Sequence, residues 1–219
     1  MSRVSNESRP DLQGAVAELL GRHHEKWITV RVTHAGPEVA RQGIAADADV
    51  EIGSVSKVLT GLLCADAITR GEVTPGTTLA EVLPLEGCDA GTITLDSLST
   101  HTSGLPRLAV DSGALAGTWN LWRHGTNPYG ASLDTLVERT RATGVGRAKA
   151  AYSNLGFMLL GHALAAATGT TYAALLAERL ATPMGLTDTS VSVARRSSRS
   201  RPTSPTDCAT ARCATLLAT

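Results

Sequence analysis

The spacing of hydrophobic residues divides the chain into helical and extended segments. In residues 11–24 the apolar side chains recur at helical spacing, which predicts a short amphipathic helix. Residues 27–33 alternate instead and are rich in β-branched side chains, and beyond Gly36 and Pro37 a second extended segment covers 39–44. The pattern therefore predicts a helix followed by a β-hairpin.

The strongest helical pattern begins at Ser54. Gly71 stands where a residue of left-handed conformation would end that helix. The apolar stripe expected to face the core consists of Val55, Val58, Leu59, Leu62, Leu63 and Ile68.

Five shorter helical patterns follow, and they are separated by turn residues. Residues 107–131 lose the pattern in Gly, Asn and Trp, as is typical of a long surface loop. The predicted helices cover 76–83, 94–100, 133–141, 155–167 and 172–180.

Composition marks three regions of the chain. Residues 1–10 are polar and are expected to be disordered, and residues 11–193 form a partial globular domain. From 194 to 219 the chain is rich in Arg, Ser and Pro without periodicity, so we expect a disordered tail. The tail has five Arg and one Asp, but it lacks the aromatic residues that stack on bases, so a solvated tail is favoured over a nucleic-acid-binding arm.

The overall composition limits the partners of the protein. The 219 residues are 42% hydrophobic and 18% charged, which is typical of one globular domain with or without a subdomain. Twenty Lys and Arg balance twenty Asp and Glu, so no net positive field attracts nucleic acid or anionic lipid. Neither a secretory signal nor an apolar run of about 18 residues is found, which predicts a cytoplasmic chain without a membrane span. The oligomeric state is not indicated.

The four cysteines give no sign of a metal site or a disulfide framework. They contain no Cys-x-x-Cys pair, and Cys64 lies in an apolar helical run where a small buried side chain is expected. No metal or other cofactor is therefore expected.

Ser54 and Lys57 form a Ser-x-x-Lys pair one helical turn apart. A serine hydroxyl becomes a good nucleophile when a base takes its proton, and a lysine with a lowered pKa can be that base. The alternative is a plain helix start, with Ser54 as N-cap and Lys57 solvated.

Tyr152 and Asn154 form a second pair, 98 residues after Ser54. A phenol can take a proton from serine and later donate it to a leaving group, while an amide can hold both a lysine and a substrate amide. The alternative is an N-cap Asn beside a packed Tyr.

Together these motifs and their neighbouring residues resemble the serine β-lactamase-related family, and within it the branch of class C β-lactamases, DD-peptidases and esterases. The resemblance covers roughly Leu12 to Val191. It rests on the segments Glu51–Lys57, Arg70–Val73, Leu98–Pro106, Ala151–Gly161 and Pro183–Asp188.

The resemblance implies an α+β fold in which helices flank an antiparallel sheet beside a helical domain. It implies that Ser54 is acylated, that Lys57 and Tyr152 share the acid and base roles, and that Asn154 orients the substrate amide. The substrate would be a small molecule or a peptide, and many relatives are exported. His101 would belong to a structural turn, which we favour over a Ser-His-Asp triad completed by Asp96 or Asp111.

One family element is not found after Ser54, namely the Lys-Thr-Gly or His-x-Gly triplet on a sheet strand. The residues His34-Ala35-Gly36 fit the His-x-Gly pattern, but they precede Ser54 and lie at a predicted hairpin turn. We therefore expect the C-terminal sheet strands to be missing, as after a truncation or a frameshift near Val193. The sequence leaves three interpretations open: a hydrolase, a non-catalytic relative that binds a ligand or partner, and an inactive fragment.

Overall fold

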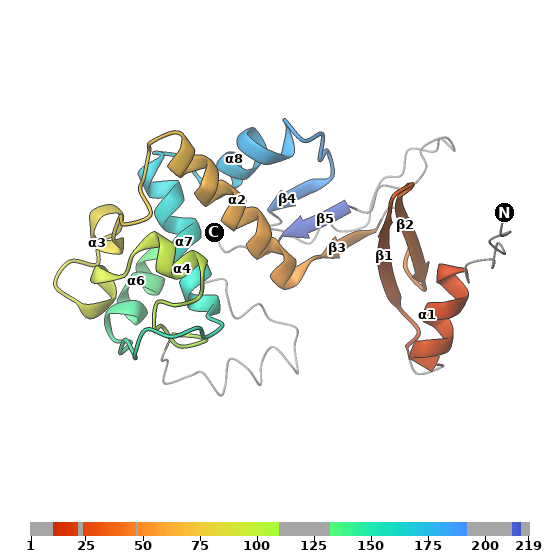
Figure 1. Cartoon of the computed structure of the whole chain (residues 1–219), viewed down its shortest axis with the longest axis horizontal. Helices are drawn as coiled ribbons and strands as arrows, with labels where there is room; N and C mark the ends of the chain where they lie inside the picture. Colours follow the sequence, from red (N-terminus) through yellow and green to blue (C-terminus); the bar gives the residue numbers. More distant parts are fainter. Residues whose placement is uncertain (1–10, 22–23, 47, 110–131, 192–211, 216–219) are drawn as a thin grey trace, which may run out of the picture. The chain divides into compact units, whose positions relative to one another are not determined.

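The computed structural model describes residues 11–21, 24–46, 48–109, 132–191 and 212–215 (Figure 1). These residues form two compact units, and the division between them falls after Val50. Arg212 belongs with the first unit, and the other described residues from Glu51 onward form the second. Residues 1–10, the expected tail from 194 onward except 212–215, and most of the expected 107–131 loop lie outside the described residues.

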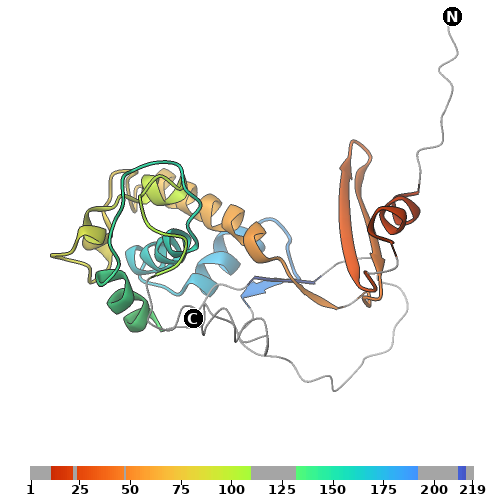
Figure 2. The same ribbon diagram turned by 90° about the horizontal axis from the view of Figure 1, so that it is seen from below.

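The first unit is a helix on a β-hairpin. Helix α1 (Leu12–Leu20) lies along one face of the antiparallel strands β1 (Trp27–Thr33) and β2 (Gly36–Gln42), as Figure 2 shows. The Asp11 carboxylate begins the helix by accepting the backbone N–H groups of residues 13 and 14. The predicted helix and hairpin are confirmed.

Gln13 connects α1 to the edge of β2. Its side-chain amide donates to the Arg41 carbonyl at 3.0 Å and accepts the Arg41 N–H at 3.1 Å. The Gln13 amide thus makes the two hydrogen bonds that a residue of a neighbouring strand would make. It covers the Arg41 N–H and C=O groups, which an edge strand would otherwise expose.

The second unit is mainly helical, and its helices match the predicted segments closely. The residues from Asp49 onward also include a short sheet with the strand order β3-β5-β4, and its strand β3 begins just before the division. The elements are β3 (Asp49–Glu51), the 3-10 turn η2 (Gly53–Val55), α2 (Ser56–Thr69), α3 (Leu79–Val82), the 3-10 turn η3 (Asp89–Thr92), α4 (Leu95–Ser99), α6 (Leu133–Arg141), α7 (Asn154–Ala167), α8 (Tyr172–Leu176), the π-helical turn η4 (Ala177–Ala181), β4 (Thr189–Val191) and β5 (Arg212–Thr215).

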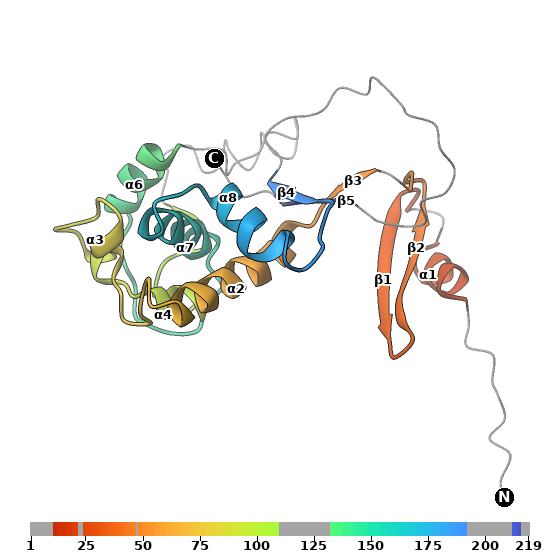
Figure 3. The same ribbon diagram turned by 90° about the horizontal axis from the view of Figure 1, so that it is seen from above.

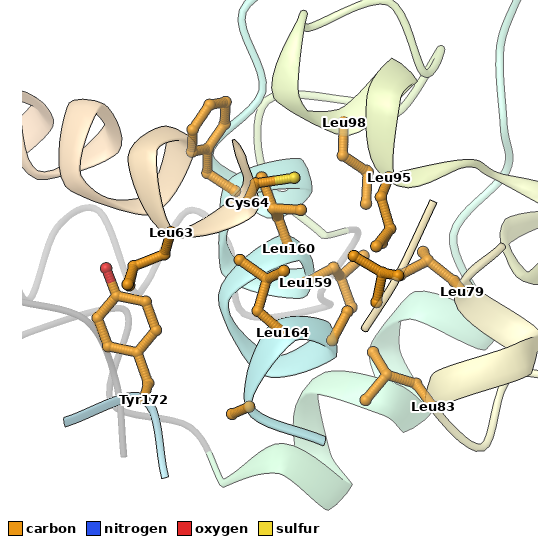
Figure 4. Packing of buried hydrophobic residues seen from close by; sticks show 14 of the residues in the cluster. Leu63, Cys64, Leu79, Leu83, Leu95, Leu98, Leu159, Leu160, Leu164 and Tyr172 are labelled. Carbon is orange, nitrogen blue, oxygen red and sulfur yellow. The ribbon is translucent and has the colours of Figure 1, made fainter. Parts of the chain in front are cut away.

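Helix α7 is the centre of this unit. It lies among α2, α4 and α8 in Figures 1 and 3, and nine of its residues are buried. Figure 4 shows Leu159, Leu160 and Leu164 of α7 packed between Leu63 of α2 and Leu95 of α4. Each fully buried leucine contributes roughly 2 kcal/mol, so this packing is the main source of stability in the unit.

The buried face of α2 differs from the predicted stripe. Val55 and Val58 are more than 60% exposed and Leu62 is 43% exposed, whereas Thr60 and Cys64 are buried. The prediction was wrong for these three apolar residues because packing against α7 and α8 selects the buried face, and the small side chains on that face allow close approach. Cys64 is buried as expected, and burial, with a smaller effect from Asp96, raises the pKa of its thiol.

The downstream strands are a second difference. We expected no strand after Asn154, but β4 and β5 form there and pair in parallel, with Thr189 opposite Cys213. β5 also lies inside the tail expected to be disordered. A three- or four-residue strand gains its hydrogen bonds from a distant partner, which a local hydrophobic pattern does not encode.

No single helix among the described residues is long and apolar enough to cross a membrane. The pair formed by α7 and the 172–181 segment passes by length and composition only, and it is bent by 85°.

Candidate active site

Ser54 lies at the tight turn that leads into α2. Gly53 has a φ of +51°, a conformation that favours glycine, and Ser54 follows it as the exposed middle residue of η2. The neighbouring Ser56 is buried and donates its hydroxyl to the Gly53 carbonyl at 2.7 Å. The turn therefore exposes one serine and uses the other to hold its own shape. Ser54 is not the simple helix N-cap of the alternative interpretation.

The Tyr152 phenol reaches Ser54 across 98 positions of sequence. Its O–H donates to Ser54 Oγ at 2.7 Å, a distance typical of a well-formed O–H···O hydrogen bond. The Tyr152 side chain remains 42% exposed, so the pair is open to solvent. The structure thus brings together the two motifs that the sequence singled out.

Lys57 lies beside the same pair of groups. Its Nζ is 5.0 Å from the centre of the Tyr152 ring and 5.8 Å from that of Phe157, within the range of cation–π attraction. The positive charge of Lys57 also lowers the pKa of the Tyr152 phenol. The lysine is therefore held over the site rather than extended into solvent.

These contacts change the acidity of the Tyr152 phenol. Burial alone would raise its pKa, but the interactions with the Lys57 and Ser54 side chains, and the positive charges of Lys57 and Arg107, lower the pKa overall. A phenol with a lowered pKa loses its proton more readily. This is the property that a proton acceptor next to a serine hydroxyl requires.

Residues 153–155 hold the segment that carries Tyr152. Ser153 caps α7, because its Oγ accepts the Gly156 N–H at 2.9 Å and donates to the Pro106 carbonyl at 2.7 Å. Asn154, the first residue of α7, donates its backbone N–H to the Arg107 carbonyl at 3.0 Å. The N-cap is thus Ser153, and Asn154 stands two residues beyond Tyr152 at the helix N-terminus.

His101 does not have the geometry of a triad histidine. In a Ser-His-Asp triad Nδ1 carries a proton and donates it to a carboxylate. Here His101 Nδ1 accepts the Ser153 N–H at 3.2 Å. Burial, followed by the charge of Lys57, lowers the His101 pKa. Asp111, one candidate partner, lies outside the described residues.

Sequence reasoning missed one residue near the site. The Arg107 guanidinium lies 5.3 Å from the centre of the Tyr152 ring, and its charge contributes to the lowered Tyr152 pKa. No spacing rule connects the two positions, which are 45 residues apart. The only signal was that Arg107 directly follows the segment Leu98–Pro106.

Among the residues that the structure describes, no group of three or more His, Cys, Asp or Glu side chains could hold a metal ion. The Tyr152 phenol contacts Ser54, and the Lys57 ammonium and the Arg107 guanidinium lie over the Tyr152 ring. These side chains suit proton transfer and the binding of negative charge.

Comparison with known proteins places this arrangement in a family. The family model described as Beta-lactamase matches residues 12–214. The D-alanyl-D-alanine-carboxypeptidase/endopeptidase AmpH of Escherichia coli is 31% identical over 147 residues, which are 65% of this chain and 37% of that protein. Penicillin-binding protein 4 of Amycolatopsis lactamdurans is 30% identical over 162 residues, which are 71% of this chain and 38% of that protein.

Solved structures agree with this assignment. A class C beta lactamase from Rhodobacter sphaeroides is 25% identical with a TM-score of 0.62, and the match covers 79% of this chain and 48% of that one. A D-stereospecific amidohydrolase from Streptomyces shares the fold at 21% identity with a TM-score of 0.66, over 80% of this chain and 54% of that one.

The chain spans just over a third of the length of these curated relatives. The family match nevertheless extends over most of the chain and includes the Ser54, Lys57 and Tyr152 positions. Members of this family are serine hydrolases. We conclude that the chain belongs to the beta-lactamase family.

Proposed function

We propose that the protein is a serine hydrolase in which Ser54 is transiently acylated. The observation that carries this proposal is the 2.7 Å hydrogen bond between Tyr152 and Ser54, formed next to the Lys57 ammonium. A nucleophile, a proton acceptor and a cation that stabilises the acceptor's charged form are thereby within reach of one another.

The proposed acylation proceeds as follows. Tyr152, as phenolate, takes the proton of Ser54 while Ser54 Oγ forms a bond to the substrate carbonyl carbon. The bond from that carbon to the leaving nitrogen or oxygen breaks, and the leaving group takes the proton from Tyr152. Water then attacks the acyl ester, which yields the free acid and restores Ser54.

Lys57 and Asn154 have supporting roles in this proposal. The Lys57 ammonium stabilises the Tyr152 phenolate, so the two residues share the acid and base functions. Asn154, at the start of α7, orients the substrate amide. The backbone N–H of Ser54, at the turn that opens α2, donates to the developing oxyanion. The family likeness supports each of these assignments.

The substrate class in this proposal is a β-lactam, a D-alanyl peptide or a small ester. Relatives described as a D-alanyl-D-alanine-carboxypeptidase/endopeptidase and as a class C beta lactamase support the first two. All three classes offer a carbonyl carbon bonded to a leaving nitrogen or oxygen, which is what an activated serine attacks.

Intact-mass spectrometry after exposure to a reactive penicillin tests the proposal. Wild type should gain the mass of one penicilloyl group, and Ser54→Ala should gain none. Ser56→Ala is the matched control, since Ser56 lies two positions away with its hydroxyl bonded to the Gly53 carbonyl. It should still be acylated. Absence of a mass gain in folded wild-type protein would contradict acylation of Ser54 by a β-lactam, and a panel of aryl esters would then test the ester class.

A second candidate is a non-catalytic relative that binds the same ligands. Within the 219 residues of this chain no Lys-Thr-Gly or His-x-Gly triplet follows Ser54. Saturable penicillin binding that persists in Ser54→Ala, without a covalent adduct in wild type, would select this candidate.

A further inference from the structure

His101 holds the backbone on both sides of Tyr152. Its carbonyl accepts the N–H of Ala151 at 2.9 Å, and its Nδ1 accepts the N–H of Ser153 at 3.2 Å. Two hydrogen bonds from one residue therefore fix the backbone N–H groups of the residues immediately before and after the tyrosine. A rigid backbone at this point limits where the phenol oxygen can lie.

The His101 ring also fixes the side chain of Tyr152. The two rings are 4.7 Å apart between centroids at an interplanar angle of 36°, and the ring of Phe157 lies 4.6 Å away on α7. These distances are within the range of favourable aromatic contacts. His101 therefore restrains the rotation of the Tyr152 ring as well as its backbone.

The backbone of His101 has an uncommon conformation. Among the described residues it is the one residue other than glycine with a positive φ, at 59°. A positive φ is uncommon for residues other than glycine, and histidine is one of the few that adopt it repeatedly. An uncommon backbone conformation that persists in a fold suggests a local function for the residue that bears it.

We propose that His101 is a positioning residue, whose neutral imidazole accepts the Ser153 N–H and thereby holds the Tyr152 phenol against Ser54. This inference rests on the proposed function, in which Tyr152 exchanges a proton with Ser54. His101 touches neither Ser54 nor the substrate in this scheme and acts only through Tyr152. Protonation at Nδ1 converts the acceptor into a donor and breaks its hydrogen bond to the Ser153 N–H.

The charges around His101 favour the neutral form that this role requires. Arg107 lies over the ring of Tyr152, the aromatic neighbour of His101. Lys57, on α2, carries a positive charge that opposes protonation of the imidazole. Burial acts in the same direction and is the larger cause of the lowered His101 pKa.

Two substitutions separate the hydrogen bond from the backbone conformation. His101→Asn and His101→Gly both tolerate a φ of +59°, but only the asparagine Oδ1 can take the place of Nδ1 as acceptor. We expect His101→Gly to lower the maximal rate of Ser54 acylation by about 10- to 100-fold with little change in the half-saturating penicillin concentration. His101→Asn should recover most of the rate. In addition, the acidic limb of the rate profile that reports His101 in wild type should be absent in His101→Asn.

An NMR titration of the wild-type protein needs neither a variant nor activity. The Ser153 amide and a ¹³Cζ-labelled Tyr152 should shift together with the His101 ring resonances, at a midpoint below the 6.5 that is ordinary for histidine. A Ser153 amide that does not follow His101, or a His101→Gly variant as fast as wild type, would overturn the positioning role. If the titration is coupled but no protein form is acylated, the hydrogen bond by which His101 holds the Tyr152 segment is supported, and the proposed function fails.

Discussion

The Tyr152 hydroxyl can be removed while the contacts of its ring are kept. In Tyr152→Phe the ring still packs on His101, but the hydrogen bond to Ser54 and the proton acceptor are lost. We expect acylation of Ser54 to slow by about 10²- to 10⁴-fold, the usual contribution of a general base. The rate is measured as adduct mass against time.

Tyr172→Phe is the matched control for this prediction. Its hydroxyl is buried and lies 2.9 Å from Thr60 Oγ1, and it has no part in the proposed reaction at Ser54. Burial raises the Tyr172 pKa to about 12, so this phenol is not a proton acceptor near neutral pH. Its loss should leave acylation unchanged and lower the free energy of unfolding by about 1 kcal/mol. Equal acylation rates in both variants would exclude Tyr152 as the base.

Arg107 provides a test of how charge acts on Tyr152. Its positive charge stabilises the phenolate, so Arg107→Gln should raise the Tyr152 pKa, whereas Arg107→Lys should raise it less. The acylation rate that depends on phenolate should then begin to rise at a higher pH in the Gln variant. NMR titration of ¹³Cζ-labelled tyrosine measures the change, and Tyr152→Phe assigns the signal. A lower midpoint in Arg107→Gln would contradict the electrostatic account.

At the residue scale, the sequence selected the residues of the candidate site but not the contacts among them. The Ser-x-x-Lys and Tyr-x-Asn motifs and the family likeness selected Ser54, Lys57 and Tyr152 before any distance was known. The contributions of Arg107 and His101 depend on ring stacking and on backbone conformation. Neither property follows a fixed spacing along the chain, so neither could be predicted from the sequence.

At the element scale, local patterns predicted where helices and strands form but not which face is buried. Strand β1 matches its predicted residues 27–33, and Gly71 has the positive φ expected of a helix stop. Helix α2 nevertheless buries Thr60, whose hydroxyl meets Tyr172 from another helix, and exposes Val58. That choice depends on the neighbouring helices, which hydrophobic periodicity in one segment cannot specify.

An ion-pair network connects the π-helical turn η4 to the end of α2. Arg179 forms a bidentate pair with Glu72, at 2.6 and 2.8 Å, and also contacts Asp66 at 3.2 Å. The hydrogen bond from Arg179, opposed by a smaller effect of burial, holds the Glu72 pKa below its ordinary value near 4.5. The network is partly exposed, so we expect Glu72→Gln to lower the free energy of unfolding by about 0.5 to 1 kcal/mol at pH 7.

The lowered pKa sets the pH range of this contribution. A carboxylate that is more acidic in the folded state stabilises the fold above its unfolded pKa, and the contribution disappears as pH falls through the folded pKa. Urea unfolding at several pH values should therefore show that the difference in free energy of unfolding between wild type and Glu72→Gln disappears as the pH falls below about 4.5. Glu86→Gln, which removes only a 3.7 Å contact with Arg141, is the control and should change stability less. If wild type were still more stable than Glu72→Gln at pH 2, the charge-based explanation would be contradicted.

At the scale of the whole molecule, hydrophobic burial is distributed unequally between the two units. All 25 residues of the buried core cluster lie between Leu63 and Leu180, within the second unit. Among the described residues of the first unit, Trp27 and Ala40 alone are buried, and α1 buries none of its residues. Because burial of apolar surface is the dominant favourable term in folding, the hairpin unit has little stabilisation of its own.

Native-state hydrogen exchange should reveal this difference. Amides of β1 and β2 open with little loss of buried surface, so they should exchange through local opening, whereas the α7 amides should exchange only through global unfolding of their unit. Added urea should accelerate exchange strongly in α7 and weakly in the hairpin, since the urea dependence follows the surface exposed on opening. Gln13→Ala removes the amide that covers the Arg41 backbone, and it should accelerate exchange of the Arg41 amide without affecting α7. Equal protection and equal urea dependence in β2 and α7 would mean that the hairpin unfolds together with the helical core, and the two units would then be a single cooperative structure.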